Sequence, residues 1–225
     1  MASSANPRPN RVKVKTTIPT KPFPLNSSRP TVTTDRLILR ALVPEDVHGL
    51  HILRTQPEIM ANNPQGRLDK DLEETKPKLA LYLAPKDETT FYFATCLKET
   101  GEMVGLGGCY STSSLLGWPV IGYMIRKELW GQGLVTEFVH AFMDIWWKLP
   151  RAEVEIEVDP RTLSGAPDGD GRVREQMSTW TTTDNIGSQR VLEKSGFEHY
   201  LTWREPDLRN PEIEVVLEAY RVYPN

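Results

Sequence analysis

Hydrophobic and polar residues alternate over several short stretches of the chain, and this pattern predicts β-strands. Residues 33–40 place Leu37 and Leu39 on one face, and residues 153–158 alternate acidic and apolar side chains throughout. Residues 91–97 are apolar almost continuously, as in a strand buried on both faces. The remaining strands are predicted at residues 103–109, 119–125, 176–183, 197–203 and 212–220.

Apolar residues at helical spacing predict four helices between these strands. The first begins at Pro44, and the second covers residues 70–83, although Pro77 interrupts it. The third covers residues 134–147, and the fourth begins at Asp184-Asn185 and ends at a glycine C-cap, Gly196. Antiparallel hairpins come first, and one strand–helix–strand crossover then implies a parallel pair. We therefore expect an α/β (α+β) domain with one central mixed sheet, mostly antiparallel, flanked by helices.

The two ends of the chain differ in composition. Residues 1–31 hold six basic residues, no acidic residue and six prolines, and we expect them to form a disordered tail. Residues 32–225 are expected to form a single domain. Residues 159–174 are rich in Gly, Pro and Asp and have few large apolar side chains, which predicts an inserted surface loop.

Charge and composition narrow the class of protein. The formal net charge is -3, but without the basic tail the remaining chain is clearly acidic. An acidic body does not suggest nucleic-acid binding, and it suits a cationic substrate such as an amine. No stretch reaches the roughly 18–20 apolar residues of a membrane span, and we expect no secretory signal, because no apolar h-region follows the first residues. Cys96 and Cys109 read as reduced core thiols. We expect a cytoplasmic protein without a membrane or nucleic-acid partner.

A glycine-rich turn separates an apolar strand from an amphipathic helix at Trp130-Gly131-Gln132-Gly133. Glycines there let backbone N–H groups point into one concavity, and the helix adds its positive N-terminal end. The turn lacks the Gly-Lys-Ser/Thr of a P-loop and the third glycine of a dinucleotide site. It is either a phosphate or pyrophosphate site or a plain tight turn.

No metal site is predicted. His48 and His51 lie three residues apart on a helix, with no third ligand nearby in the sequence. Asp168-Gly-Asp170-Gly begins like a calcium loop, but Arg172 stands where a third ligand is needed.

A second signature follows the glycine turn by about fifty residues: Asn185-Ile-Gly-Ser188-Gln-Arg-Val-Leu-Glu-Lys-Ser-Gly196-Phe197. With it, the chain resembles the GNAT superfamily of acyl-CoA-dependent N-acetyltransferases. It is most similar to the branch that includes the bacterial ribosomal-protein N-terminal acetyltransferases. Thr34-Asp35-Arg36-Leu37-Ile38-Leu39-Arg40, Ile121-Gly122-Tyr123 and Thr136-Glu137 are also similar to that branch, and all the segments occur in matching order from about residue 33 to 220.

The resemblance implies acetyl-CoA as cosubstrate and a mixed sheet in which one parallel strand pair splays apart. It implies that the pantetheine arm lies along the strand that holds Met124 and Ile125, with Arg126 next to it. The pyrophosphate is expected on the backbone of Gly131, Gln132, Gly133, Leu134, Val135 and Thr136. Asn185 and Ser188 are expected at the cofactor as well. Glu128 departs from the family pattern, because an acid near a pyrophosphate is unhelpful, and we expect it to face solvent.

The resemblance also suggests catalytic residues. Many family members protonate the departing thiolate with a Tyr, but that position is Leu192 here. In the similar branch a Ser is proposed for this step, and Ser188 matches it. Alternatively, Ser188 only caps its helix. Glu205 and Asp207 match the region of a proposed acid and are the candidates for the general base that deprotonates the amine; His199 is a weaker one.

We therefore expect an N-acetyltransferase that moves an acetyl group from acetyl-CoA to a primary amine, either a small amine or a protein N-terminus, as a monomer or homodimer. Direct attack within a ternary complex is expected, because neither cysteine lies near an activating base in the sequence. The alternative is an acyl-CoA-binding protein with little or no transferase activity.

Overall fold

The computed structural model describes residues 9–165 and 168–224. Its chain divides into two compact units. Unit 1 consists of Met1–Pro19, Thr112–Val120 and Pro150–Asn225, and unit 2 consists of Thr20–Ser111 and Ile121–Leu149. The single domain expected for residues 32–225 stays a prediction.

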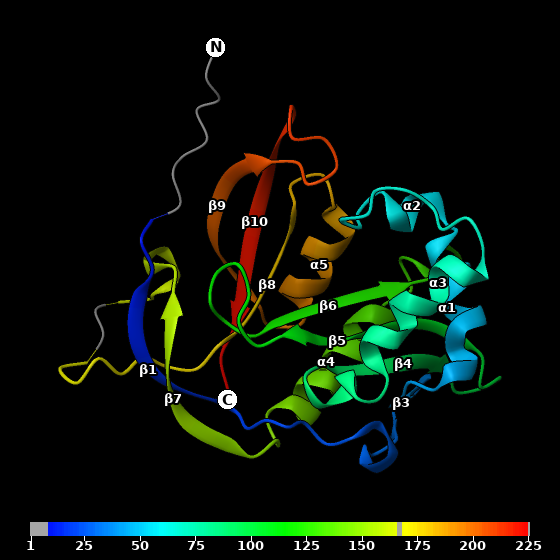
Figure 1. Cartoon of the computed structure of the whole chain (residues 1–225), viewed down its shortest axis with the longest axis horizontal. Coiled ribbons are helices and arrows are strands. Elements are labelled where there is room, and N and C mark those ends of the chain that lie inside the picture. Colours follow the sequence, from blue (N-terminus) through cyan, green and yellow to red (C-terminus); the bar gives the residue numbers. More distant parts are fainter. Residues whose placement is uncertain (1–8, 166–167, 225) are drawn as a thin grey trace. The chain divides into compact units, whose positions relative to one another are not determined.

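Unit 2 contains strands in the order β2-β3-β4-β5-β6 and four helices (Figure 1). The strands are β2 (Val32–Thr33), β3 (Leu37–Ala41), β4 (Phe91–Leu97), β5 (Met103–Ser111) and β6 (Val120–Ile125), whose first residue belongs to unit 1. The helices are α1 (Val47–Arg54), α2 (Pro57–Met60), α3 (Leu72–Leu79) and α4 (Leu134–Trp146). Short 3-10 turns are η1 (Asn26–Ser28), η2 (Pro44–Asp46), η3 (Ala80–Tyr82), η4 (Lys86–Glu88) and η5 (Lys127–Leu129).

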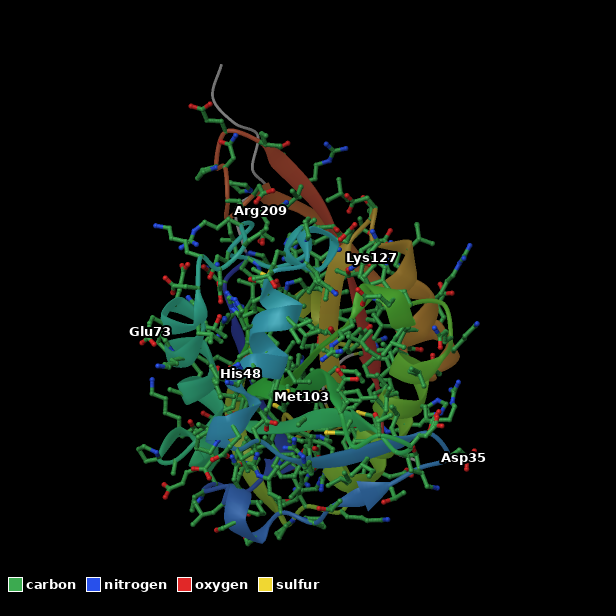
Figure 2. The ribbon with its side chains drawn as sticks, turned by 90° about the vertical axis from the view of Figure 1, so that its right-hand side faces the viewer. Asp35, His48, Glu73, Met103, Lys127 and Arg209 are labelled. Carbon is green, nitrogen blue, oxygen red and sulfur yellow. The ribbon has the colours of Figure 1, made fainter. Side chains whose placement is uncertain are left out.

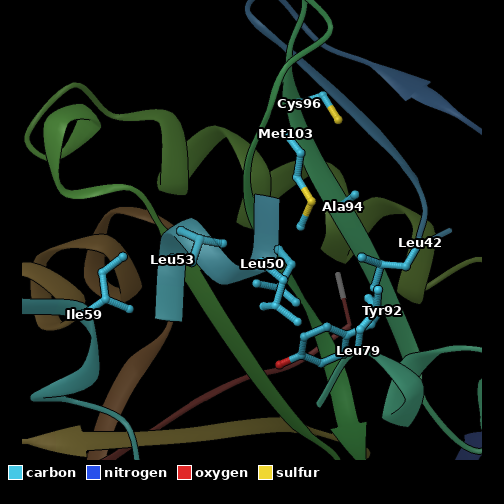
Figure 3. Close-up of a cluster of buried hydrophobic side chains, with 10 residues drawn as sticks. Leu42, Leu50, Leu53, Ile59, Leu79, Tyr92, Ala94, Cys96 and Met103 are labelled. Atoms are coloured by element: carbon cyan, nitrogen blue, oxygen red, sulfur yellow. The ribbon is translucent and has the colours of Figure 1, made fainter. Parts of the chain in front are cut away.

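Strand β4 carries helices on both of its faces, which explains its continuous apolar sequence. On one face, Tyr92, Ala94 and Cys96 pack into a cluster with Leu50 of α1 and Leu79 of α3 (Figure 3). Side chains of a strand point alternately to opposite faces, so Phe91 and Phe93 point the other way. Each fully buried side chain of this kind contributes about 1.5–3 kcal/mol to stability.

The other face of β4 is covered by the aromatic stripe of α4. Phe142 lies with its ring centroid 6.1 Å from that of Phe91 and 6.3 Å from that of Phe93. Phe138, Phe142 and Trp146 follow one another along the helix as a stacked series. This packing fixes α4, and with it the N-terminal end of α4, against the sheet of unit 2.

Helix α1 approaches β5 closely because it contains a glycine. A Cβ at Gly49 would lie 2.9 Å from the sulfur of Met103, which lies against α1 (Figure 2). A glycine inside a helix costs about 0.5–1 kcal/mol relative to alanine. Glycine is nonetheless needed at position 49, because any larger side chain would overlap Met103.

The second predicted helix differs from the structure in its length. Residues 70–83 form α3 from Leu72 to Leu79, followed by the 3-10 turn η3. Asp71 caps α3 by accepting a hydrogen bond from the N–H of Glu74 at 2.9 Å. Pro77 lies inside the last turn of the helix, which ends two residues later. A proline cannot donate the backbone hydrogen bond of a continuing helix, and this shortens the element.

The described residues of unit 1 form five strands and one helix in addition to the first residue of β6. They are β1 (Val12–Pro19), β7 (Arg151–Val158), β8 (Met177–Thr182), α5 (Ile186–Lys194), β9 (Glu198–Pro206) and β10 (Glu214–Val222), with the 3-10 turn η6 (Pro160–Thr162). Strands β8, β10 and β9 pair antiparallel in that order, and β1 pairs antiparallel with β7 (Figure 1). Val120 pairs in parallel with Ser178 of β8.

The expectation of a disordered tail over residues 1–31 is wrong for β1 and for η1. Val14 and Thr16 of β1 are buried, with exposed fractions of 1% and 2%. Val14 pairs with Ile156 in the β7 ladder. The alternation Val12-Lys-Val14-Lys-Thr16 covers only five residues of a basic, proline-rich segment, and its partner strand β7 lies far away in the sequence. Residues 1–8 lie outside the described residues.

Backbone hydrogen bonds also tie the predicted inserted loop to β1. Lys15 donates its N–H to the carbonyl of Gly171 at 2.9 Å and accepts from the N–H of Val173 at 2.8 Å. Trp118 donates its indole N–H to Thr162 Oγ1 at 2.8 Å. Residues 159–174 are therefore anchored to unit 1 at several points, and residues 166–167 lie outside the described residues.

The expected fold class is confirmed. The fold is mixed α/β, mostly antiparallel, with one parallel pair formed by β6 and β8 and with flanking helices. The first strand after α4 is β7, which pairs with β1, so β8 rather than β7 is the parallel partner of β6. No helix in the described part of the chain is both long and apolar enough to cross a membrane.

Candidate active site

The turn between β6 and α4 has the backbone conformation that its glycines predict. Gly131 and Gly133 have φ angles of 74° and 78°, in the left-handed region that favours glycine. A Cβ at Gly131 would meet nothing within 4 Å. Glycine is therefore required at position 131 by the backbone conformation, and the space beside it is open to a ligand.

Helix α4 begins directly at this turn. Gly133 is its N-cap residue and supplies no side-chain cap. Glu137 is the first residue whose N–H bonds back to the turn, to the carbonyl of Gly133 at 3.1 Å. The N–H groups of residues 134–136 thus have no intrahelical acceptor and lie at the positive end of the helix dipole. Residues 131–136 fit a phosphate or pyrophosphate group.

The charged residues before the turn have partners of their own. Arg126 pairs with Glu102 at 2.6 Å and donates to the carbonyl of Met103 at 2.9 Å, and Lys127 pairs with Glu58. Arg126 and Lys127 are therefore each paired with a carboxylate already. Figure 2 labels Lys127 at this end of β6.

Glu128, the acid that departs from the family pattern, is exposed, and Gln56 holds it. Gln56 Nε2 donates to the two carboxylate oxygens at 2.9 Å and 3.1 Å, and Gln56 Oε1 accepts from the N–H of Lys127. Backbone hydrogen bonding and the Gln56 amide lower the pKa of Glu128. The side chain thus remains an anion with a fixed partner at the start of α2.

Met124 is half-buried and Ile125 is buried at the end of β6. The carbonyl of Ile125 accepts a hydrogen bond from the indole N–H of Trp130 at 3.0 Å, and the N–H of Arg126 donates to the carbonyl of Val104 at 2.9 Å. These contacts hold the backbone between β6 and the glycine turn in one conformation.

In unit 1, Asn185 rather than Ser188 caps α5. Asn185 Oδ1 accepts a hydrogen bond from the N–H of Ser188 at 3.2 Å. Gln189 Nε2 donates to the carbonyls of Thr182 and Thr183, at 3.2 Å and 3.0 Å, and ties the helix to the end of β8. The half-buried Ser188 is therefore placed by its neighbours in the first turn of α5, and capping the helix does not need its hydroxyl.

The two candidate bases on β9 and just after it have different surroundings. Glu205 is half-buried and accepts a hydrogen bond from the indole N–H of Trp203 at 3.1 Å. Asp207 forms a two-point ion pair with Arg209, whose Nε lies 2.8 Å and 3.0 Å from its carboxylate oxygens. Hydrogen bonds from Arg209 lower the pKa of Asp207 to about 2. Asp207 is therefore a weak base.

His199, the other candidate base, lies on β9. His199 is exposed, contacts Thr202 Oγ1 and packs its ring edge-on against Tyr220. Among the described residues, no group of three or more His, Cys, Asp or Glu side chains gathers as a metal ion would require. Sequence reasoning gave no role to Thr34, Arg36 or Gln56, although Thr34 and Arg36 lie in a recognised motif.

The glycine turn at the end of β6 leads into a helix without a side-chain cap, and the two together form a candidate anion site. Residues 36–198 match the family model of the acetyltransferase (GNAT) domain. The chain belongs to this family of acetyltransferases, as the sequence motifs predicted. Among curated proteins, none matches the sequence.

Solved structures show the same fold at low sequence identity. A GNAT-family acetyltransferase from Bacillus anthracis is 16% identical with a TM-score of 0.63, and the match covers 86% of this chain and 98% of that one. RimL, a ribosomal L7/L12 alpha-N-protein acetyltransferase in complex with coenzyme A, is 16% identical with a TM-score of 0.62 over 86% and 98% of the two chains. A ribosomal-protein-S5-alanine acetyltransferase from Vibrio fischeri is 15% identical with a TM-score of 0.58 over 85% and 96%.

Proposed function

We propose that this acetyltransferase moves the acetyl group of acetyl-CoA to a primary amine by direct attack in a ternary complex. The observation that carries the proposal is the turn at residues 131–136, where two left-handed glycines lead into a helix without a side-chain cap. This backbone suits the pyrophosphate of coenzyme A. The family match supports acetyl-CoA as the donor.

The reaction needs two proton transfers. The amine lone pair attacks the thioester carbonyl carbon, a C–N bond forms, and the C–S bond breaks with its electron pair going to sulfur. A base takes one proton from the amine nitrogen, and an acid gives one to the thiolate. We assign the acid to Ser188. We further assign to a backbone N–H of β6 that precedes Arg126, whose own N–H donates to Val104, the role of stabilising the oxygen on which negative charge develops.

We assign the base to Glu205 rather than Asp207. Glu205 accepts from the Trp203 indole, whereas Asp207 is committed to Arg209. The variant Glu205→Gln is expected to lower kcat by about 100-fold, the usual contribution of a general base. Asp207→Asn is the matched control, and its kcat is expected to fall by less than about threefold, because the ion-paired carboxylate has little basicity.

Initial rates of both variants at saturating acetyl-CoA, measured with the same amine, test this assignment. A larger loss of kcat in Asp207→Asn than in Glu205→Gln would reverse it. The melting temperature of each variant separates lost catalysis from lost folding, since Asp207 and Arg209 also hold the segment that joins β9 to β10.

The acceptor class is proposed as a small amine or a protein N-terminus. An acidic chain outside the N-terminal segment attracts cationic acceptors. RimL and the Vibrio fischeri protein, which have the same fold, carry the names of acetyltransferases for ribosomal proteins. Activity profiling with polyamines, aryl alkyl amines and peptides with free N-termini tests the class, and activity toward none of them would contradict the proposal.

A further inference from the structure

A tight turn before β3 contacts both the glycine turn and the first turn of α4. Thr34 Oγ1 accepts from the N–H of Leu37 at 3.0 Å, and the N–H of Thr34 bonds to the Leu37 carbonyl at 2.9 Å. These bonds close a short turn that contains Asp35 and Arg36; Asp35 is labelled in Figure 2. All of these residues, the glycine turn and α4 belong to unit 2.

Glu137 in the first turn of α4 receives the polar groups of this segment. Its Oε1 accepts from Thr34 Oγ1 at 2.6 Å and from the N–H of Arg36 at 2.8 Å. Its Oε2 accepts from Arg36 Nε at 2.7 Å. Burial acts to raise the pKa of Glu137, but the hydrogen bonds from Thr34 and Arg36 outweigh it and lower the pKa. An ionised Glu137 therefore holds the Arg36 guanidinium in a fixed position.

The guanidinium also reaches the glycine turn. Arg36 Nη1 donates to the backbone carbonyl of Gln132 at 2.8 Å. A trans peptide is planar and its C=O and N–H point in opposite directions. Fixing the carbonyl of Gln132 toward Arg36 therefore fixes the N–H of Gly133 away from Arg36. Between two glycines, which have the freest backbones of all residues, this orientation is not set by the local sequence.

We propose that Arg36, held by Thr34 and Glu137, is a positioning residue that orients the Gln132–Gly133 peptide for binding the pyrophosphate of acetyl-CoA. This inference rests on the proposed function of the turn. Arg36 acts by holding the Gln132 carbonyl, so a positive charge at position 36 is not enough. The side chain must also contact Glu137 and Gln132 at the same time. The Thr34-x-Arg36 motif and the Gly131-x-Gly133 motif then form one cofactor-binding unit, although about 100 residues separate Arg36 from Gln132.

The test compares two acetyl donors, because acetyl-pantetheine lacks the pyrophosphate. Arg36→Ala is expected to raise the Kd and KM of acetyl-CoA about tenfold, the effect of losing one hydrogen bond to a charged group. The kcat and the KM of acetyl-pantetheine are expected to stay within about twofold. Glu137→Gln, which keeps the shape of the side chain, is expected to shift the same parameters in the same direction and gives a second reading if Arg36→Ala folds poorly.

Two further variants make the test specific. Arg67→Ala removes an ion pair of similar exposure in the same unit, since 54% of Arg67 and 21% of Glu74 are exposed against 50% of Arg36 and 17% of Glu137. It is expected to leave both donors unaffected. Arg36→Lys keeps the charge but loses the planar fork that contacts Glu137 and Gln132 together, and it is expected to behave like Arg36→Ala.

The outcomes separate this inference from the proposed function. If wild-type protein binds acetyl-CoA and Arg36→Ala binds it equally well, the positioning role is wrong and the proposed function stands. An equal loss for acetyl-CoA and acetyl-pantetheine, or full rescue by Arg36→Lys, would also overturn the positioning role. If the wild-type protein does not bind acetyl-CoA, the proposed function fails, and this inference fails with it.

Discussion

The variant Ser188→Ala is expected to lower kcat by about 100-fold or more, the usual contribution of a general acid. The Kd of acetyl-CoA is expected to change by less than about twofold, because the hydroxyl is needed only when the thiolate leaves. Steady-state rates of thiol release give kcat, and equilibrium binding of acetyl-CoA gives the Kd.

The capping geometry supplies the control for this variant. Asn185 makes the capping bond to the N–H of Ser188, so Asn185→Ala is expected to destabilise α5 by about 1 kcal/mol, as lost N-caps do. Ser188→Ala should leave the melting temperature of the protein unchanged. If Ser188→Ala instead lowers the melting temperature and leaves kcat intact, the residue has a structural role and another group protonates the thiolate.

The second large effect concerns stability and the buried ion pair of unit 2. Arg54→Ala is expected to lower the free energy of unfolding by about 3–5 kcal/mol, because it leaves Asp69 as a buried charge without its cation. The side chains of Arg54 and Asp69 are 7% and 0% exposed, with Arg54 Nε 2.6 Å from Asp69 Oδ2. Thr75 Oγ1 and Gln65 Nε2 also donate to the Asp69 carboxylate, both at 2.8 Å.

The exposed pair Arg67–Glu74 is the control for this stability effect. Arg67→Ala is expected to change the free energy of unfolding by less than about 1 kcal/mol, since exposed ion pairs contribute little. The double variant Arg54→Met with Asp69→Asn is expected to recover most of the loss, because no buried charge remains. Urea unfolding of the three variants at pH 7 measures these differences. Equal losses in Arg54→Ala and Arg67→Ala would contradict this account.

The same pair predicts how stability depends on pH. Burial acts to raise the pKa of Asp69, but hydrogen bonds from Arg54, Gln65 and Thr75 outweigh it and hold that pKa at about 2. A carboxylate with a lowered folded-state pKa stabilises the fold fully above its ordinary value near 3.8, and this contribution is lost as the pH falls toward 2. In Arg54→Ala, the buried Asp69 can take up a proton as the pH falls and so lose its unpaired charge. The difference in free energy of unfolding between this variant and the wild type should therefore become smaller as the pH is lowered from 7 to 4.

Elements with a strong local pattern were predictable from the sequence. The continuous apolar run of β4 is explained by helices on both faces, and the apolar stripe of α4 is the aromatic stripe that packs on Phe91 and Phe93. The strand β1 was missed, because its alternation covers few residues and its stability comes from pairing with β7, more than 130 residues away. Local patterns report which face of an element is apolar, but they do not report distant partners.

In the candidate site, too, local features were predictable from the sequence and contacts between distant segments were not. The glycines at 131 and 133 were predictable, because their φ angles follow from the need for a left-handed turn. The sequence spacing allowed Asp207 as a general base as well as Glu205. Only the structure shows that Arg209 forms a two-point ion pair with Asp207, which makes Asp207 a weak base. The contacts of Glu137 with Thr34 and Arg36 join segments about 100 residues apart, and no local signal indicates them.

The central claim is acetyl transfer from acetyl-CoA to an amine, and thiol release in the presence and absence of amines tests it most directly. The wild-type protein is expected to bind acetyl-CoA, to release little free thiol alone, and to release thiol and acetylated amine in equal amounts when a suitable amine is added. Binding of acetyl-CoA without turnover on any amine would contradict the claim and favour an acyl-CoA-binding protein.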